Sequence, residues 1–368
     1  MKPINVLAQQ IDRVEEYIAT TWPVALSQAR SLRSFNRKIT QILIGGCGES
    51  HHAAMGLELA FGVYTGKPTR ALDAMHLARY APNLVGAQPE SKLVIGISAS
   101  GEVARTIEAL EIWSEAGAQT LAFTTNIDST LARVAQGSLI LPAPDIPHGP
   151  GLLSYIGSLL LGYATIATML EGMEQQRIID LIAMMPELLR EWVMTERIRS
   201  ERFAQKVSQG VTVFLGSGAA HGSAHFAAAK VIEAAGERCW AQDVEEWAHL
   251  EYFCEPDEMP TVLLSSEGRS LSRELELLEA MAVLGRMVHL SKWQGGSGWS
   301  ALEREMVSPL ALWAGPCVYA STRATILGEK PFRDFRGGRD RKEGGGPSRI
   351  RSSQRVDMGA LDQPDEGP

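Results

Sequence analysis

One short pattern, a buried strand that runs into a glycine turn and then a helix, occurs twice in this chain. Apolar residues 42–44 lead into Gly45-Gly46-Cys47-Gly48 and a predicted helix over 51–64. Residues 211–215 lead in the same way into Gly216-Ser217-Gly218 and a predicted helix that ends near Ala235. Placing Gly48 on Gly218 gives an offset of 170 residues, and placing Ser98 on Ser265 gives 167. This near-constant offset predicts an internal duplication of one α/β unit. Two unrelated α/β domains with similar turns are the alternative.

The remaining strands and helices alternate in both halves. Strands are predicted at 92–97, 119–124, 138–142, 260–264 and 287–290, and helices at 103–116 and 272–284. Residues 152 to about 205 form a long helical zone, and residues 5–33 read as one or two helices interrupted at Pro23. Continuous apolar strands between helices indicate a parallel sheet covered on both faces. We therefore expect an α/β fold whose ligands bind at the carboxyl ends of the strands.

The chain of 368 residues has room for about two domains. We expect an N-terminal helical segment at 1–34, a first unit at 35–195, a second unit at 196–328 and a Gly/Arg-rich arm at 329–368. Residues 330–355 hold nine Lys or Arg and three acids. This arm is either a solvated tail or a segment that lies over an anionic site.

Composition excludes several classes of protein. The net charge of −8 argues against a general nucleic-acid binder. No uninterrupted apolar run reaches the ~18 residues of a membrane span, and the acidic N-terminus does not resemble a signal peptide. The four cysteines have no C-x-x-C spacing, so a disulfide framework or zinc site is not expected. We expect a cytoplasmic protein with no nucleic acid, membrane or metal partner.

The turn Ser98-Ala99-Ser100-Gly101-Glu102 lies between a buried strand and a helix. Hydroxyl groups and backbone N–H groups at a helix N-terminus suit a dianionic phosphate. Ser50, at the start of the helix after Gly48, adds another hydroxyl. Neither turn has the lysine of a Walker motif, and Gly45–Gly48 lacks the third glycine of the dinucleotide signature. Each serine alone could be a helix N-cap, but two such turns at adjacent strand ends favour a ligand site.

These turns, G-C-G-x-S and S-x-S-G-E, resemble those of the SIS (sugar isomerase) family. The resemblance covers about residues 35–330 and is to double-SIS phosphosugar isomerases, such as the isomerase half of glucosamine-6-phosphate synthase and related deglycases. It implies two SIS units, each a flavodoxin-like three-layer α/β/α sandwich, with the sugar phosphate bound by the first. The residues that it places at phosphate or substrate are Gly48, Ser50, Ser98, Ala99, Ser100, Gly101, Val103, Gly216 and Ser217.

Two positions in these turns depart from the pattern of that family. Val103 stands where the family often has Thr, so one hydroxyl donor is lost. Glu49 stands where the isomerases usually have Thr. An acid next to a phosphate is unfavourable, unless it points away or meets an amine of the substrate.

The second unit carries a different signal, in which Lys230 and Glu233 are three residues apart on a predicted helix. The resemblance places Glu233 on the catalytic carboxylate, Lys230 on the lysine beside it and His249 on the catalytic histidine. Taken alone, Lys230 and Glu233 would be a solvated surface pair and His249 a structural or exposed histidine. The joint match of order, spacing and upstream turns favours catalysis.

The segment before His249 matches the family only in part. Glu246 falls on the acid before the histidine, but Glu245 replaces a glycine, and Leu250 stands where the isomerases have glycine. The resemblance also implies that the histidine reaches the neighbouring subunit of a homodimer with shared active sites. A C-terminal basic residue would close the site, and the candidates are Arg336, Arg339, Arg341, Lys342, Arg349 and Arg351.

The chemistry of the residues agrees with aldose–ketose isomerisation of a sugar phosphate or amino-sugar phosphate. A carboxylate can move a proton between adjacent carbons through an enediol or enolamine, and a histidine can assist ring opening near neutral pH. No metal or redox cofactor is required. Fructosamine-6-phosphate deglycase or amino-sugar-phosphate deaminase activity is the close alternative. A non-catalytic phosphosugar sensor is a rival, as is an α/β binding protein without phosphate specificity.

Overall fold

The structure, a computed structural model, describes residues 5–32, 39–84, 88–142, 145–147, 149–208 and 210–332. The six basic candidates of the C-terminal arm, from Arg336 to Arg351, lie outside these residues, so their role stays a prediction. In the same ranges, no helix combines the length and the apolar character needed to cross a bilayer.

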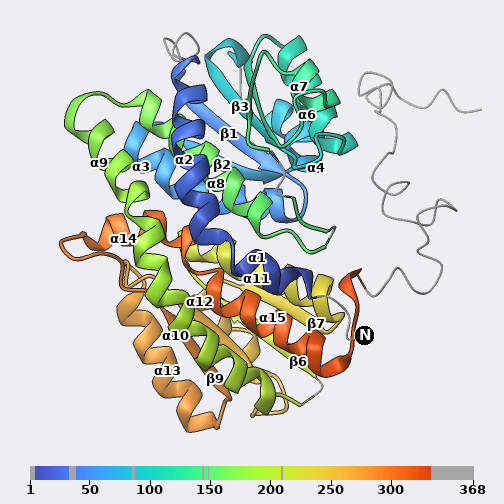
Figure 1. Cartoon of the computed structure of the whole chain (residues 1–368), viewed down its shortest axis with the longest axis vertical. Helices are drawn as coiled ribbons and strands as arrows, with labels where there is room; N and C mark the ends of the chain where they lie inside the picture. Colours follow the sequence, from blue (N-terminus) through green and yellow to red (C-terminus); the bar gives the residue numbers. More distant parts are fainter. Residues whose placement is uncertain are drawn as a thin grey trace, which may run out of the picture.

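Two parallel β-sheets form the framework of the molecule, one in the upper half of Figure 1 and one in the lower half. The first sheet has five strands in the order β2-β1-β3-β4-β5, which is the order of flavodoxin-like folds. The elements from the start of the chain to the end of this unit are α1 (Val6–Ile11), α2 (Val14–Arg30), β1 (Gln41–Gly46), α3 (Glu49–Thr65), β2 (Thr69–Asp73), α4 (Ala74–Arg79), α5 (Ala81–Leu84), β3 (Lys92–Ile97), α6 (Ala104–Glu115), β4 (Gln119–Thr124), α7 (Thr130–Val134), β5 (Gly137–Ile140) and α8 (Leu153–Met169).

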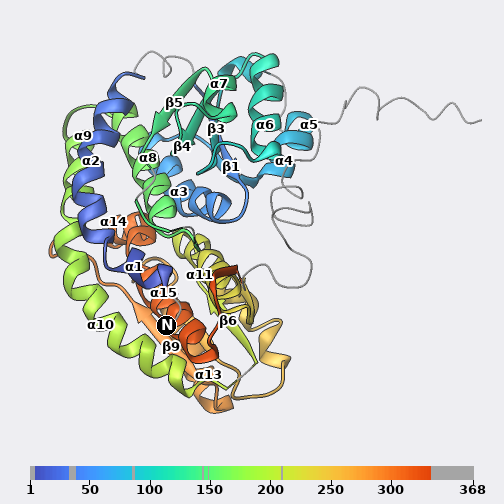
Figure 2. The same ribbon diagram turned by 45° about the vertical axis from the view of Figure 1, so that its right-hand side comes forward.

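The second sheet repeats this order without a fifth strand, as β7-β6-β8-β9. The remaining elements are α9 (Gly172–Ala183), α10 (Met185–Lys206), β6 (Val211–Leu215), α11 (Ala219–Ala235), β7 (Arg238–Gln242), α12 (Val244–Trp247), β8 (Thr261–Ser265), α13 (Leu271–Leu284), β9 (Val288–Lys292), α14 (Ala301–Val307) and α15 (Ala314–Leu327). In Figure 2, α11 lies between the second sheet and the helices of the first unit.

The glycine turns show that the two units are copies. Helices α3 and α11 are both 17 residues long, and each begins after a glycine N-cap with almost the same backbone angles. Gly48 has φ 57° and ψ −127°, and Gly218 has φ 59° and ψ −129°. Both helices also end at a left-handed glycine, Gly66 and Gly236. The same offset of 170 residues thus relates both ends of the helices, and the predicted duplicated α/β fold is confirmed.

One hydrophobic core joins the two sheets. Along β1, Ile42 and Ile44 belong to this shared core, whereas Leu43 packs on the opposite face. Val262 and Leu264 of β8 enter the same shared core from the second sheet. Helices α3, α8, α11 and α15 fill the space between the sheets, while α4, α6 and α7 cover the outer face of the first sheet and α12 and α13 that of the second. This arrangement brings helices of the two units into direct contact.

The N-terminal helices differ from the prediction at Pro23. This proline lies inside α2, and the break between the helices falls at Asp12 and Arg13. Proline removes one backbone hydrogen bond from a helix interior, but α2 buries Ile18 and Trp22 against the shared core. Tertiary packing therefore maintains the helix through the proline.

Two strands, β2 and β7, were missed in the sequence. Both lie at the edges of their sheets and are largely half-exposed. Each carries an exposed arginine, Arg70 or Arg238. Edge strands commonly carry such charges, and the continuous apolar run that revealed the central strands is therefore absent from them.

Candidate active site

The first glycine turn connects the end of β1 to the start of α3. A Cβ atom at Gly46 would come within 2.5 Å of the Ile97 carbonyl oxygen and 2.7 Å of the Ser50 Cβ atom, so no side chain fits there. Gly48 has a positive φ, which favours glycine, and a Cβ atom at this position would meet no atom within 4 Å. The glycine turn therefore places Ser50 at the start of α3 and leaves open space beside Gly48.

The second turn follows β3, and its serines stabilise the backbone. Ser98 is buried, and its hydroxyl accepts a hydrogen bond from the Gly101 N–H at 3.1 Å. The Ser100 hydroxyl accepts one from the Glu102 N–H at 3.2 Å. Because each hydroxyl is the acceptor in these bonds, neither bond uses its proton.

The other two predicted residues of this turn, Ala99 and Val103, position its backbone. The Ala99 carbonyl accepts hydrogen bonds from the Thr125 N–H at 3.0 Å and the Thr125 hydroxyl at 2.8 Å. Val103 is the N-cap of α6 and contributes no side-chain capping bond. Since Val103, not a serine, is the N-cap, Ser98 and Ser100 do not cap α6. A helix start without such a cap suits an anion.

The two turns leave the first sheet side by side. Strands β1 and β3 are neighbours, and Gly46 lies beside Ile97 in their register. The hydroxyl groups of Ser50, Ser98 and Ser100 therefore belong to turns at one carboxyl edge. This is the edge at which open parallel sheets bind ligands.

A second group of residues lies where α11 crosses α3. Lys230, on α11, is fully buried. Its ammonium donates to Glu233 Oε2 at 2.6 Å, to Glu49 Oε2 at 3.2 Å and to the Gly151 carbonyl oxygen at 3.0 Å. These bonds use all three N–H groups of the ammonium. Lys230 and Glu233 therefore belong to a buried network that joins the two units and are not a solvated surface pair.

The two carboxylates determine the charge of Lys230. Burial alone lowers the pKa of a lysine, but the nearby Glu233 and Glu49 outweigh it and raise the pKa of Lys230 above its ordinary value. The side chains of Glu233 and Glu49 remain 29% and 20% exposed. The charged ammonium thus holds both carboxylates while each stays accessible to a ligand.

Small residues allow these elements to approach. A Cβ atom at Gly222 would come within 2.6 Å of the Gly56 nitrogen, and one at Gly151 within 2.4 Å of Glu49 Oε2. Sequence reasoning missed the contact of Glu49 with Lys230. The two residues are 181 positions apart, and only the crossing of the two helices brings them together.

His249 lies outside this network. Its side chain is 66% exposed, and Nε2 lies 3.4 Å from Glu245 Oε1. Glu245 also accepts a hydrogen bond from Arg273 at 2.7 Å, and Glu246 is exposed. Among the described residues, no hydrogen bond or ion pair joins His249 to Glu233. A single chain therefore does not assemble the predicted catalytic pair.

The glycine turn of the second unit has the same backbone but a different neighbour. A Cβ atom at Gly218 would lie 2.6 Å from Glu305 Oε1. The Glu305 side chain is 5% exposed, and its Oε2 accepts a hydrogen bond from Arg269 at 2.9 Å. A carboxylate thus borders the turn that contains Gly216 and Ser217, both predicted to bind ligand. Its negative charge disfavours a second phosphate at this position.

Four histidines gather at the crossing of α3 and α11. The Nε2 atoms of His221 and His225 are 3.1 Å apart, and the ring centres of His52 and His225 are 5.8 Å apart. His51 adjoins His52. Burial is the main cause that lowers the pKa of His52 to about 3 and that of His225 to about 4. Within the described ranges, no group of three or more His, Cys, Asp or Glu side chains is arranged to hold a metal ion.

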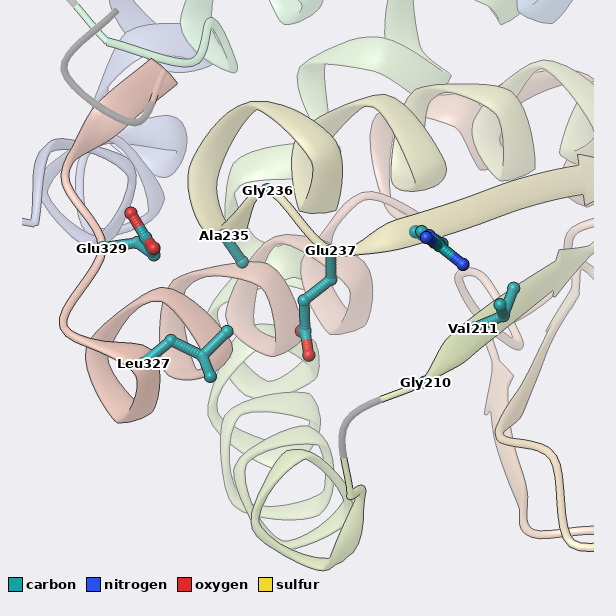
Figure 3. A pocket seen from close by; sticks show the side chains of 8 residues that line it. Gly210, Val211, Ala235, Gly236, Glu237, Leu327 and Glu329 are labelled. Atoms are coloured by element: carbon teal, nitrogen blue, oxygen red, sulfur yellow. The ribbon is translucent and has the colours of Figure 1, made fainter. Parts of the chain in front are cut away.

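Two cavities lie elsewhere in the molecule. One of about 500 Å³ opens where β6 and β7 begin, at the amino edge of the second sheet, and Figure 3 shows Glu237 and Leu327 among the side chains around it. The other, of about 490 Å³, lies between α2 and the helices α9 and α10 and is lined in part by Trp22 and Arg190. Neither cavity is at a carboxyl edge, so neither coincides with the candidate site.

Comparison of the sequence with known proteins identifies part of the chain. The family model of the SIS domain matches residues 36–168. A glutamine–fructose-6-phosphate aminotransferase (isomerizing) of Aquifex aeolicus is 27% identical over 259 residues, which are 70% of this chain and 42% of that protein. The corresponding protein of Halobacterium salinarum is 32% identical over 111 residues, 30% of this chain and 18% of that protein. The chain therefore spans less than half the length of these curated relatives.

Solved structures match nearly the whole described fold. The C-terminal domain of glucosamine-fructose-6-phosphate aminotransferase from Francisella tularensis has a TM-score of 0.74 at 17% identity, covering 86% of this chain and 96% of that one. Tagatose-6-phosphate ketose/aldose isomerase from Escherichia coli has a TM-score of 0.70 at 17% identity, covering 89% and 94%. Glucosamine-6-phosphate deaminase from Thermotoga maritima has a TM-score of 0.59 at 18% identity, covering 84% and 95%. Residues 36–168 are therefore an SIS domain, and the chain as a whole has the duplicated SIS fold.

Proposed function

We propose that this protein is a sugar-phosphate isomerase that moves a proton between adjacent carbons of a phosphorylated sugar or amino sugar. The observation that carries the proposal is the buried Lys230, which holds Glu233 at the contact between the two units. The names of the solved isomerase and deaminase with the same fold support this class of reaction.

In this proposal the first unit binds the phosphate. Ser50, Ser98 and Ser100 donate hydroxyl protons to its oxygens, and the backbone at Ala99 and Gly101 completes the cradle. The open space above Gly48 gives the phosphate room. The uncapped start of α6 contributes the partial positive charge of a helix N-terminus.

Glu233 is the base. It takes a proton from the carbon next to the carbonyl, which leaves an enediolate, and returns this proton to the former carbonyl carbon. The hydroxyl proton passes from its oxygen to the former carbonyl oxygen, so the protons balance. No electrons leave the substrate, since one carbon is oxidised as its neighbour is reduced. Lys230 is a positioning residue, because its three hydrogen bonds are already made within the protein.

His249 assists ring opening in this proposal, and it does so in the site of a second copy of the chain. In its own chain it is exposed and makes no described contact with Glu233. The neighbouring Leu250, Tyr252 and Phe253 are 53%, 46% and 75% exposed, which fits a surface that contacts another chain. A homodimer with shared active sites would account for both the exposed histidine and the exposed apolar side chains beside it.

Exchange of the substrate's carbon-bound hydrogen with D₂O tests the function. We expect the wild type to incorporate deuterium next to the carbonyl of its sugar phosphate, measured by proton NMR over a panel of six-carbon phosphosugars. Glu233→Gln should slow this exchange by about 10²–10⁴-fold and leave the ligand-induced rise in melting temperature unchanged. Exchange at the wild-type rate in Glu233→Gln would overturn the assignment of the base.

A matched control is Glu279→Gln, which removes an exposed carboxylate from the outer helix α13. It should exchange deuterium like the wild type. Tight binding of a phosphosugar by the wild type without any exchange would instead support the sensor.

Removal of an amine from the sugar is the second candidate function, because the same proton transfer also prepares a carbon–nitrogen bond for cleavage. Glu49 favours this candidate, since its carboxylate lies in the network of the proposed base. Ammonia release from an amino-sugar phosphate, or amine release from a fructosamine phosphate, would distinguish it from isomerisation.

A further inference from the structure

Glu49 places a negative charge beside the turn proposed to bind a phosphate, where such a charge is unfavourable. It is the residue before Ser50 and opens α3, directly after Gly48. Its Oε1 accepts a hydrogen bond from the Ser154 hydroxyl at 2.6 Å, and its Oε2 accepts one from Lys230 at 3.2 Å. The carboxylate is therefore fixed from two sides, by α8 of the first unit and by α11 of the second.

The surroundings of Glu49 are shaped to accommodate it. A Cβ atom at Gly151 would lie 2.4 Å from Glu49 Oε2 and 2.5 Å from Ser154 Oγ, so a side chain there would displace the carboxylate from its present position. The acid also lies in the first turn of a helix, where the helix dipole favours negative charge. Each carboxylate oxygen has capacity for more than one hydrogen bond, and 20% of the side chain remains exposed.

The charges of the network do not cancel. Glu49 and Glu233 contribute two negative charges, and Lys230 contributes one positive charge. His52 lies nearby, but the pKa of about 3 that burial gives it keeps it neutral at physiological pH. The network therefore keeps a net negative charge next to the turn proposed to bind a phosphate dianion. A substrate that carried only the phosphate would be repelled here, whereas an added ammonium group would be attracted.

We infer that Glu49 is a specificity-determining residue that binds a protonated amine on the substrate. The inference rests on the proposed function and narrows its substrate to sugar phosphates that bear an amine near the carbon from which Glu233 takes the proton. The phosphate lies in the first-unit turns, and the ammonium group meets Glu49 on the side toward Glu233. Such a substrate is anionic at one end and cationic at the other, which matches the arrangement of the site.

A pair of probes that differ only at carbon 2 tests this inference. Glucosamine 6-phosphate carries an amine there, and glucose 6-phosphate carries a hydroxyl. We expect calorimetric titration of the full chain to show at least about tenfold tighter binding of the amine, since a hydrogen bond between charged groups contributes roughly 1.5–3 kcal/mol. Glu49→Gln should lose most of this preference, because it carries no charge, although its amide oxygen can still accept from Lys230 and its NH₂ group can donate to the Ser154 hydroxyl.

Three further measurements separate recognition from a structural role. Glu49→Asp keeps the charge and should keep part of the preference, and Glu58→Gln on the same helix should keep all of it. Inorganic phosphate should bind Glu49→Gln at least as tightly as the wild type, because a negative charge is removed from its surroundings. A merely structural role for Glu49 would weaken both probes equally and leave the ratio of their dissociation constants unchanged.

The possible failures are distinct. If the wild type binds both probes equally, or if Glu49→Gln keeps the preference, the role of Glu49 is wrong while the phosphosugar site stands. If the wild type binds neither probe nor any other sugar phosphate, the proposed function fails, and the inference fails with it.

Discussion

The two units of the duplicated fold contain corresponding helices, α3 and α11, whose polar residues lie at different positions. Helix α3 begins with Glu49 and Ser50, and the offset of 170 places Ala219 and Ala220 at these positions of α11. Conversely, α11 carries Lys230 and Glu233, where α3 has alanine and valine at positions 60 and 63. Each copy has kept polar residues at the positions where the other has small or apolar ones.

The turns in front of these helices differ in the same way. Gly48 faces open space, whereas Gly218 lies beside the carboxylate of Glu305. The backbone angles of the two glycines are nearly identical. Duplication has therefore preserved the conformation of the turn, and the residues around it decide whether an anion is tolerated. The polar residues of both copies meet in one network because α3 and α11 pack against each other.

Removing the cation of this network should have the largest effect. Lys230→Met removes the buried cation between Glu49 and Glu233, so the two partly exposed carboxylates repel each other. We expect the rate of deuterium exchange to fall at least about 100-fold and the free energy of unfolding, measured in urea, to fall by about 3 kcal/mol. Lys292→Met is a matched control, since Lys292 pairs with Glu267 at 2.5 Å but is 32% exposed. It should cost less than about 1 kcal/mol. Equal stability of the two variants would show that the network does not join the units.

The serine turns test which copy binds the phosphate. Ser98→Ala combined with Ser100→Ala should raise the KM for the phosphorylated substrate about ten- to a hundredfold, because two hydrogen bonds to a charged group are lost. The value of kcat should change less. Ser266→Ala in the corresponding turn of the second unit should leave KM unchanged. If the second-unit variant raised KM as much as the first-unit pair, the division between the copies would be wrong.

Glu305 offers a way to make the second turn resemble the first. Glu305→Gln removes its charge and frees the guanidinium of Arg269. We expect calorimetry with inorganic phosphate to show one site per chain in the wild type and an additional weak site in the variant. The variant should also lose about 1–2 kcal/mol of stability, because a charged hydrogen bond is replaced by a neutral one. An unchanged number of sites would mean that a feature other than this carboxylate separates the two turns.

The histidine cluster is shared by the copies only in part, since the offset of 170 places His51 on His221 but His52 on Gly222. We expect it to make the contact between the units sensitive to acid. Burial lowers the pKa of His52 to about 3, against about 6.5 in an unfolded chain. The unfolded state then binds more protons between these values, so stability falls as the pH falls below about 6.5. His52→Phe should remove about 1–2 kcal/mol of the stability difference between about pH 7 and pH 5, measured by urea unfolding. The same pH dependence in wild type and variant would exclude His52 as its source.

Central elements of the fold could be predicted from the sequence, whereas edge elements could not. Strands β3 and β4 have the predicted bounds because their residues are buried on both faces and form continuous apolar runs. Strands β2 and β7 pair on one side only, and their polar residues interrupt the apolar pattern by which a strand is recognised. The helix break predicted at Pro23 was wrong because packing against the core compensated for one missing backbone hydrogen bond.

Some features of the candidate site could likewise be predicted from the sequence, whereas others could not. The turns around Ser50 and Ser98 were recognisable because they are local in sequence, and glycine is required where φ is positive or a Cβ atom would clash. The roles of Glu49 and Glu305 could not be recognised from the sequence. Each role depends on a residue far away in the chain, Lys230 for Glu49 and Gly218 for Glu305. The exposed position of His249 could not be predicted either, because the neighbouring residues in the sequence do not indicate whether a histidine contacts the site of its own chain.

The sequence by itself determined the duplicated α/β pattern, the two glycine turns and the hydroxyl groups that they present. These features depend on hydrophobic periodicity and on backbone angles, which neighbouring residues control. The tertiary structure alone decided that Lys230 is buried between two carboxylates and that a carboxylate borders the turn of the second unit. Such arrangements depend on how two helices cross and on charges brought together from distant positions. Electrostatic energy depends on distance and burial, and neither can be read from the order of the residues.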